Sequence, residues 1–131
     1  MTHEQLGERV AYWCGRLQMD PWRITTSVVN EPHGQQRDAV HASIGTASAY
    51  LYAELQFARK WVRSNPSDYD RDQTIVHELL HCLFRDLDKA AEIPYGALGS
   101  ITEEVVEARY DHELEQLIDR LAHVIVTLDS E

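Results

Sequence analysis

Two histidines four residues apart, in a stretch with few charged residues, place the strongest constraint on this chain. The stretch is TIVHELLHCLF, residues 74–84, in which Glu78 directly follows His77 and His81 lies one helical turn further on. Apolar residues recur around it at helical spacing, and residues four apart on a helix share one face. We therefore expect a helix from about residue 70 to about residue 91 that presents both imidazole rings on the same side.

Such a pair of histidines can give one ring nitrogen each to a single Zn²⁺ at about 2.0–2.1 Å. Glu78 is turned by about 100° from His77, so it reaches a water on the ion more easily than the ion itself. This arrangement places a general base beside an activated water. Two other interpretations remain open: a pair of exposed surface histidines, or a site that binds metal without catalysis.

The whole chain has the composition of a folded domain, with 131 residues and 44% apolar residues. We predict a single domain over residues 1–131, because this length allows one modest core. A formal net charge of −10 opposes binding to nucleic acid, since it repels the phosphate backbone. No segment is long and apolar enough to cross a membrane. The N-terminus lacks the features of a signal peptide, and two distant cysteines predict a cytoplasmic protein with reduced thiols.

The hydrophobic pattern predicts an α+β fold in which a three-stranded, mostly antiparallel sheet follows an N-terminal helix. Thr2 and Gln5 have the spacing of a capping box at the start of that helix. A final helix should pack antiparallel to the histidine helix, with Leu117, Leu121 and Val124 on its packed side. The expected elements are a helix at 2–18, strands at 22–30, 38–45 and 48–57 with a hairpin turn at 45–47, and helices at 70–91 and 102–128.

The segment TIVHELLHCL resembles the extended zinc signature of the zincin metallopeptidases at every position of that signature. The resemblance implies a zinc-dependent peptidase that acts on a peptide or protein, with a sheet edge holding the substrate as an added strand. Strand 48–57 is the candidate for that edge. Metzincins are excluded, because Phe84 and Leu87 stand where they have glycine and histidine and no methionine follows. The gluzincins, whose third ligand is a glutamate on a later helix, resemble this chain better; compact members occur on phage and prophage genomes and in bacterial regulatory systems.

The third ligand should come from the final helix. If that helix folds back antiparallel, its residue level with His81 lies near position 112, since His81 is about 15 Å from the expected helix end. Gluzincins have a Glu-x-x-x-Asp pattern, in which the aspartate supports a ligand histidine, and Glu115 with Asp119 resembles it. We predict one Zn²⁺ held by His77, His81 and Glu115. The alternatives are Glu113, Glu107, Glu103, Glu104 and His112.

In this interpretation Glu78 is the general base that activates water for attack on a peptide bond. The residue that stabilises the developing oxyanion stays open among Tyr50, Tyr52, Tyr95, Tyr110 and Arg85. Two other functions remain: a zincin-fold binding or regulatory module without turnover, and a structural zinc domain. The sequence determines neither the substrate and its cleavage preference nor the oligomeric state.

Overall fold

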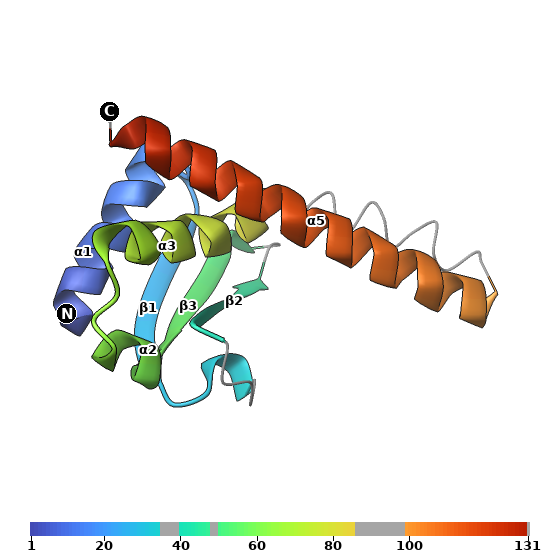
Figure 1. Ribbon diagram of the computed structural model, residues 1–131, viewed down its shortest axis with the longest axis horizontal. Helices are drawn as coiled ribbons and strands as arrows, with labels where there is room; N and C mark the ends of the chain where they lie inside the picture. Colours follow the sequence, from blue (N-terminus) through green and yellow to red (C-terminus); the bar gives the residue numbers. More distant parts are fainter. Residues whose placement is uncertain (35–39, 48–49, 86–98, 131) are drawn as a thin grey trace.

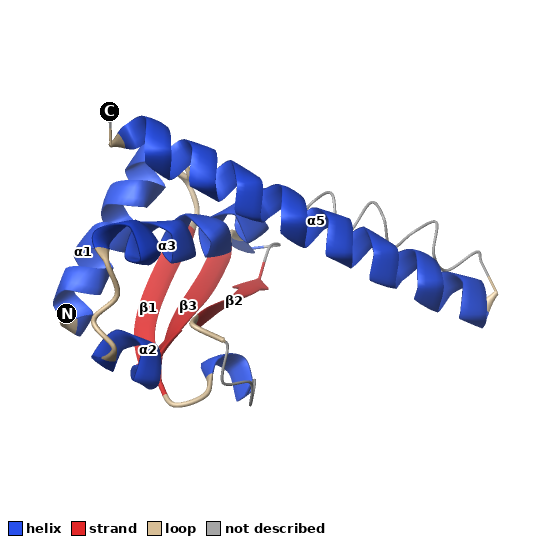
Figure 2. Cartoon of the chain, viewed as in Figure 1, coloured by secondary structure: helices blue, strands red, loops and turns tan. Residues whose placement is uncertain are grey.

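The structure is a computed structural model that describes residues 1–34, 40–47, 50–85 and 99–130, with only the backbone of Ser100, Ile101 and Glu103. The α+β prediction is confirmed: helices cover a three-stranded sheet (Figures 1 and 2). In chain order the elements are α1 (His3–Arg16), β1 (Arg23–Val29), η1 (Pro32–Gly34), β2 (Ala42–Ala47), β3 (Tyr52–Ala58), α2 (Arg59–Arg63), α3 (Asp68–Leu83) and α5 (Ser100–Asp129).

Helix α1 begins at the predicted capping box. The Thr2 hydroxyl accepts a hydrogen bond from the backbone N–H of Gln5 at 3.1 Å, and the Gln5 side chain accepts one from the backbone N–H of Thr2 at 2.8 Å. These bonds satisfy two of the N–H groups that a helix start leaves unpaired. Leu6, Val10 and Trp13 share one face of α1 and are buried, so this face contributes to the core.

The sheet has the strand order β1-β3-β2 and is mixed. β2 and β3 are antiparallel, as expected for consecutive strands, but β1 pairs with β3 in parallel. The prediction of a mostly antiparallel sheet is wrong for that pair. The whole segment 30–51 separates β1 from β3, which is long enough for the crossover that a parallel pair requires. β3 is therefore the central strand, and β2 lies at an edge.

The third predicted strand is present as β3, and its side chains alternate between a buried and a more exposed face. Ala53, Leu55 and Phe57 are fully buried, whereas Tyr52 on the other face is 38% exposed. The expected hairpin turn at 45–47 is wrong, because these residues continue β2 and pair with Glu54, Ala53 and Tyr52 of β3. Helix α2 was not predicted. It buries Trp61, which stacks on Phe57 with ring centroids 5.6 Å apart.

Helix α3 begins at Ser67, whose hydroxyl accepts a hydrogen bond from the backbone N–H of Asp70 at 3.1 Å. It ends at Leu83, so the prediction of a helix to about residue 91 is wrong; residues 86–91 lie outside the described part. Phe84 caps α3 with φ −92° and ψ 4°, and its N–H donates to the Leu80 carbonyl at 3.0 Å. α5 runs antiparallel to α3, as predicted, and extends well past the end of α3 (Figure 1).

The rotation of α5 differs from the prediction. Leu117 and Val124 are 45% and 49% exposed, although they were assigned to the packed side. The side chains that α5 buries are instead Leu114, Ile118, Ala122 and Val126. Both sets are apolar and recur at helical spacing, so the pattern alone did not determine which one faces the body. The buried set joins residues of α1, the sheet and α3 in one hydrophobic cluster.

Among the described residues, no helix combines the length and the apolar character that a membrane span requires.

Candidate metal centre

The predicted histidine pair lies near the C-terminal end of α3. The rings of His77 and His81 have their centroids 5.1 Å apart, and both side chains are partly buried, at 18% and 24% exposure. The four-residue spacing on a regular helix brings them to one face, as expected. Leu79 and Leu80, between them in sequence, point into the core and are 0% and 4% exposed. The same helix therefore anchors the pair in the core and presents it at the surface.

Glu115 of α5 lies against both imidazoles. One carboxylate oxygen, Oε2, is 3.1 Å from His77 Nε2, and the other, Oε1, is 2.8 Å from His81 Nε2. In a tetrahedral zinc site with bonds of 2.0–2.1 Å, neighbouring ligand atoms are about 3.3–3.4 Å apart. One ligand atom from each of the three residues can be chosen so that all lie within 4.8 Å of one another. Small movements would thus allow these atoms to hold one divalent cation.

Asp119 lies one turn after Glu115 and supports His77 from the other side of its ring. Its Oδ1 is 3.1 Å from His77 Nδ1, and the Gln73 side-chain amide donates to both the Oδ1 and the backbone carbonyl of Asp119 at 3.3 Å. A proton on Nδ1 that is donated to Asp119 leaves the lone pair of Nε2 available for a metal. The structure thus shows the contact that the resemblance to gluzincins implied for Asp119.

The other candidates for a third ligand do not join this cluster. Glu113 forms an ion pair with Arg109 at 3.1 Å, and His112 Nε2 is 3.1 Å from the side-chain nitrogen of Gln116. Two further candidates, Glu104 and Glu107, are exposed. The side chain of Glu103 lies outside the described residues. Within the described part of the chain, the metal-compatible cluster has three members. On a four-coordinate ion, these would leave one position for water.

The charges at the centre are strongly coupled. Burial disfavours the charged form of His77, but hydrogen bonds to Glu115 and Asp119 and the nearby Glu78 outweigh it and raise the pKa of His77 to about 8. Hydrogen bonds from His77 and His81 hold the pKa of Glu115 well below its usual range. Without a cation, the proton on His77 partly compensates the carboxylates. A bound cation would take over that role and displace the proton.

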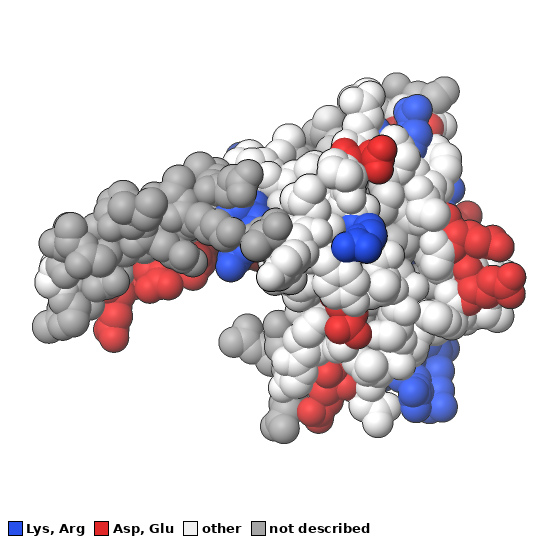
Figure 3. Space-filling view, turned by 180° about the vertical axis from the view of Figure 1, so that it is seen from behind, with Lys and Arg blue, Asp and Glu red and all other residues white. Residues whose placement is uncertain are grey.

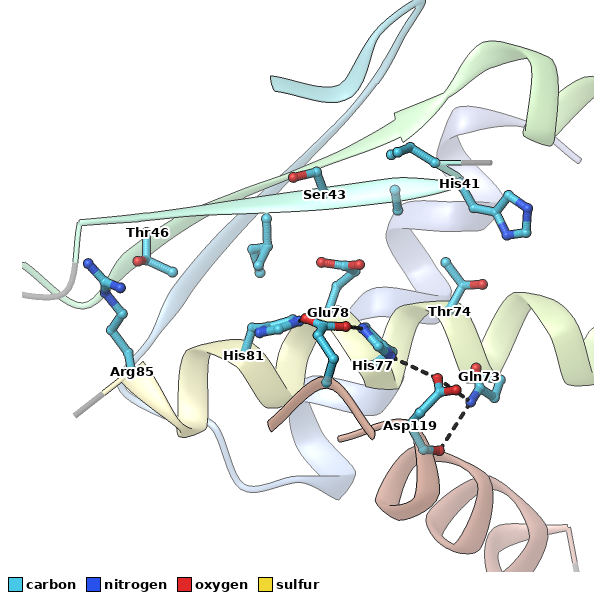
Figure 4. Close-up of a pocket in the computed structure, with 14 residues that line it drawn as sticks. His41, Ser43, Thr46, Gln73, Thr74, His77, Glu78, His81, Arg85 and Asp119 are labelled. Atoms are coloured by element: carbon cyan, nitrogen blue, oxygen red, sulfur yellow. Dashed lines mark hydrogen bonds and ion pairs between the residues drawn. The ribbon is translucent and has the colours of Figure 1, made fainter. Parts of the chain in front are cut away.

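Glu78 projects from α3 toward β2, between the two histidines and the sheet edge (Figure 4). Burial raises the pKa of Glu78 to about 7, although His77, His81 and a backbone hydrogen bond with Ile44 act in the opposite direction. A carboxylate with this pKa exchanges protons readily near neutral pH, which is the property required of a general base. The sequence prediction placed Glu78 beside the site correctly, but it did not include Ile44.

The centre lies at the floor of a pocket of about 730 Å³. One wall is the edge strand β2 with the residue pair before it, and the other is formed by α3 and α5 (Figure 4). The lining residues are Val40, His41, Ala42, Ser43, Ile44, Thr46, Gln73, Thr74, His77, Glu78, His81, Arg85, Glu115 and Asp119. The expectation that strand 48–57 receives the substrate is wrong. That strand is β3, and both of its edges are already paired with β1 and β2.

The candidates for oxyanion stabilisation can now be separated. Arg85 lines the pocket, opposite Thr46 at the end of β2 (Figure 4). Tyr50 is 76% exposed, Tyr52 bonds to the Thr25 hydroxyl at 3.1 Å on the outer face of the sheet, and Tyr110 packs against the core. Tyr95 lies outside the described residues. His41 lies at the pocket wall and stacks on Trp61.

Sequence reasoning missed Gln73 and the residues of β2. Gln73 lies one turn before His77, so helical spacing could have placed it on the same face. The contribution of β2 carried no such signal, because it depends on which strand occupies the sheet edge. On the face in Figure 3, acidic side chains lie along the projecting part of α5 and in several patches on the body, and Lys and Arg form separate patches.

Comparisons with models of protein families, with curated proteins and with solved structures find no match to this chain. The interpretation of the centre therefore depends on the residues and distances described above.

Proposed function

We propose that the chain is a zinc-dependent metallopeptidase in which His77, His81 and Glu115 hold Zn²⁺ and Glu78 is the general base. One observation carries the proposal: Glu115, on a helix distant in sequence, has its two carboxylate oxygens 3.1 and 2.8 Å from the Nε2 atoms of two histidines one turn apart. A structural zinc site would require a fourth protein ligand, and the described residues supply three.

The position of the edge strand β2 is the argument that the substrate is a peptide. Its outer edge lines the pocket beside Glu78, and within the described residues no further strand pairs with it. The edge of a sheet can take up an extended peptide through main-chain hydrogen bonds. A peptide in that position would bring a backbone carbonyl near the metal centre. Arg85 lines the same pocket and is the cationic group that would stabilise negative charge on that carbonyl oxygen.

The chemistry divides between the ion and the chain. Zn²⁺, when bound, supplies a Lewis acid that polarises a carbonyl and lowers the pKa of water. Glu78 takes a proton from the water that attacks the peptide carbonyl and passes it to the leaving amine. Asp119 and Gln73 hold the His77 ring in orientation.

The two cysteines are free and Cys82 is buried, which supports a reducing, cytoplasmic compartment.

The test separates metal binding from turnover. Purified protein is analysed for zinc and incubated with a library of internally quenched peptides, and cleavage is compared with that of Glu78→Gln. We expect the variant to keep one equivalent of zinc and to lose about 10²–10⁴-fold in rate, as is typical for a missing general base. Glu54→Gln is the matched control, because Glu54 lies on β3 and does not line the pocket. Equal cleavage by Glu78→Gln and the parent would overturn the mechanism; stoichiometric zinc without any cleavage would favour a binding module.

A further inference from the structure

A stack of three aromatic rings ends at one end of the pocket. Phe57 of β3 and Trp61 of α2 have ring centroids 5.6 Å apart and an interplanar angle of 11°, and His41 stacks on Trp61 at 5.8 Å and 15°. Phe57 and Trp61 are buried, whereas His41 is exposed and lines the pocket. The core thus holds one face of the His41 ring, and within the described part of the chain no second ring stacks on the other face.

The backbone of His41 is fixed as well. β2 begins at Ala42, but the His41 carbonyl accepts a hydrogen bond from the backbone N–H of Ala58 at 2.8 Å, so the ladder between β2 and β3 includes His41. Residues of an antiparallel strand direct their backbone groups alternately toward the partner strand and away from it. Ala42, Ile44 and Thr46 therefore present N–H and C=O groups at the outer edge, beside the pocket. A peptide bound to these groups would run along β2 to the His41 ring.

The position of His41 along β2 indicates which residue of a peptide it would meet. Glu78 forms a hydrogen bond with the backbone of Ile44, so the peptide bond that Glu78 acts on would lie near Ile44. His41 precedes Ile44 by three residues, which corresponds to about 10 Å at about 3.3 Å per residue of a strand. An added strand advances by the same length per residue. Its side chain beside His41 is therefore about three positions away from the bond that is cut.

The rest of the pocket lining gives no other place for a ring to stack. Apart from the two candidate ligand histidines, the other described side chains that line the pocket are aliphatic, polar or charged. Figure 4 shows His41 at the end of the pocket near Thr74, and Arg85 at the opposite end. Aromatic rings attract one another in offset-stacked and edge-to-face arrangements. A ring from a bound peptide could therefore extend the stack at His41.

We propose that His41 is a specificity residue that stacks with an aromatic side chain of the substrate, about three residues from the bond that is cut. This inference rests on the proposed peptidase function and adds the substrate class: a peptide or protein segment with phenylalanine, tyrosine or tryptophan at that position. Trp61 holds the His41 ring in place for this contact. Because strands pair in either direction, the position lies on the N-terminal or the C-terminal side of the bond.

The first test measures cleavage by the zinc-loaded full chain with a library of internally quenched peptides in which each position is varied in turn. Aromatic residues at the third position on one side of the bond should raise kcat/KM about tenfold over alanine, mainly through KM. His41→Ala should lose this preference and keep its zinc, whereas His41→Phe, which retains a ring, should keep both. His3→Ala is the matched control, because His3 is exposed on α1 and does not line the pocket. Circular dichroism verifies that each variant is folded.

The second test separates this inference from the proposed function. Zinc-loaded Glu78→Gln is titrated with two fluorescent peptides of alanine and serine, one of which carries a single phenylalanine, and binding is followed by fluorescence anisotropy. The phenylalanine peptide should bind about tenfold more tightly, and the added change His41→Ala should make the two affinities equal. Binding with this preference but without cleavage by the parent would refute the peptidase and support the subsite. Equal affinities in Glu78→Gln, an aromatic preference that survives His41→Ala, or a stronger preference for arginine would overturn the subsite.

Discussion

Competition between protons and zinc at His77 gives the sharpest quantitative prediction. The pKa of His77 in the metal-free protein is raised to about 8 by Glu115, Glu78 and Asp119, against the effect of burial. Only the neutral ring can coordinate the ion. For a pKa of about 8, the neutral fraction falls from about one half at pH 8 to about one per cent at pH 6, so the Kd for zinc should rise about 50-fold from this group alone.

An unperturbed imidazole, with a pKa of about 6.5, would give only about a fourfold change over the same interval. The measurement is a competition titration with a chromophoric chelator whose own proton competition is known, at several pH values between 6 and 8. Asp119→Asn removes one of the interactions that raise the pKa of His77, so its Kd should change less steeply with pH. A change of less than about tenfold in the parent would refute the assigned charge coupling.

Protonation of His77 should weaken zinc binding but stabilise the folded, metal-free protein. The folded pKa of His77 lies above the unfolded value of about 6.5, so protonation stabilises the metal-free protein fully below pH 6.5. This contribution, at most about 2 kcal/mol, is lost as the pH rises through about 8. Metal-free protein should therefore unfold at a lower denaturant concentration at pH 9 than at pH 6, whereas zinc should stabilise the protein more at pH 8 than at pH 6. A pH effect of the same sign in both forms would contradict the coupling.

Two substitutions test the supports of the centre and of the fold. Asp119→Ala should lower zinc affinity about 10- to 100-fold in the same titration, because His77 loses the acceptor that orients its ring. Asp72→Ala should lower the free energy of unfolding in urea by about 2–3 kcal/mol, because Asp72 is buried and accepts two hydrogen bonds from Arg9, at 2.8 and 2.6 Å. Asp68→Ala, at a side chain that is 93% exposed and pairs with Arg71 at 3.2 Å, should lower the free energy of unfolding by at most about 1 kcal/mol. Equal effects of the two aspartate changes in urea would refute the assignment of Asp72.

The parts of the fold that depend on local spacing were predictable. The capping box of α1, the alternation of β3 and the placement of His77 and His81 on one face follow from helical and strand periods that a sequence displays directly. The strand order did not follow from such periods. β3 lies between β1 and β2 because β1 pairs with β3 and not with β2, which is the next strand in sequence. That choice depends on tertiary packing, so the prediction took the central strand β3 for an edge strand.

The position of Glu115 beside the two histidines was predicted for reasons that were only partly correct. The prediction that a residue near 112 lies beside His81 assumed that α3 continues to about residue 91. α3 ends at Leu83 instead, and a long stretch of α5 precedes the residue that lies beside His81. The choice of Glu115 depended on its spacing to Asp119, and that spacing is a property of one helix. Because residues four apart stay on one face wherever the helix ends, the pair reaches His77 and His81 together or not at all. The level along the helix was therefore less informative than the internal spacing.

The rotation of α5 determines both which of its side chains reach α3 and which of its apolar side chains stay exposed. A helix with one apolar stripe would have a single way to pack, whereas α5 has two stripes and buries the one that contains Ile118 and Ala122. Burial of that stripe turns Glu115 toward α3, since Glu115 precedes Ile118 by three residues and shares its side of the helix. Burial of Leu117 and Val124 against the body would instead turn Glu115 away from the histidines. The choice between the two stripes thus determines whether Glu115 reaches the two histidines, and it leaves Leu117 and Val124 exposed at the surface.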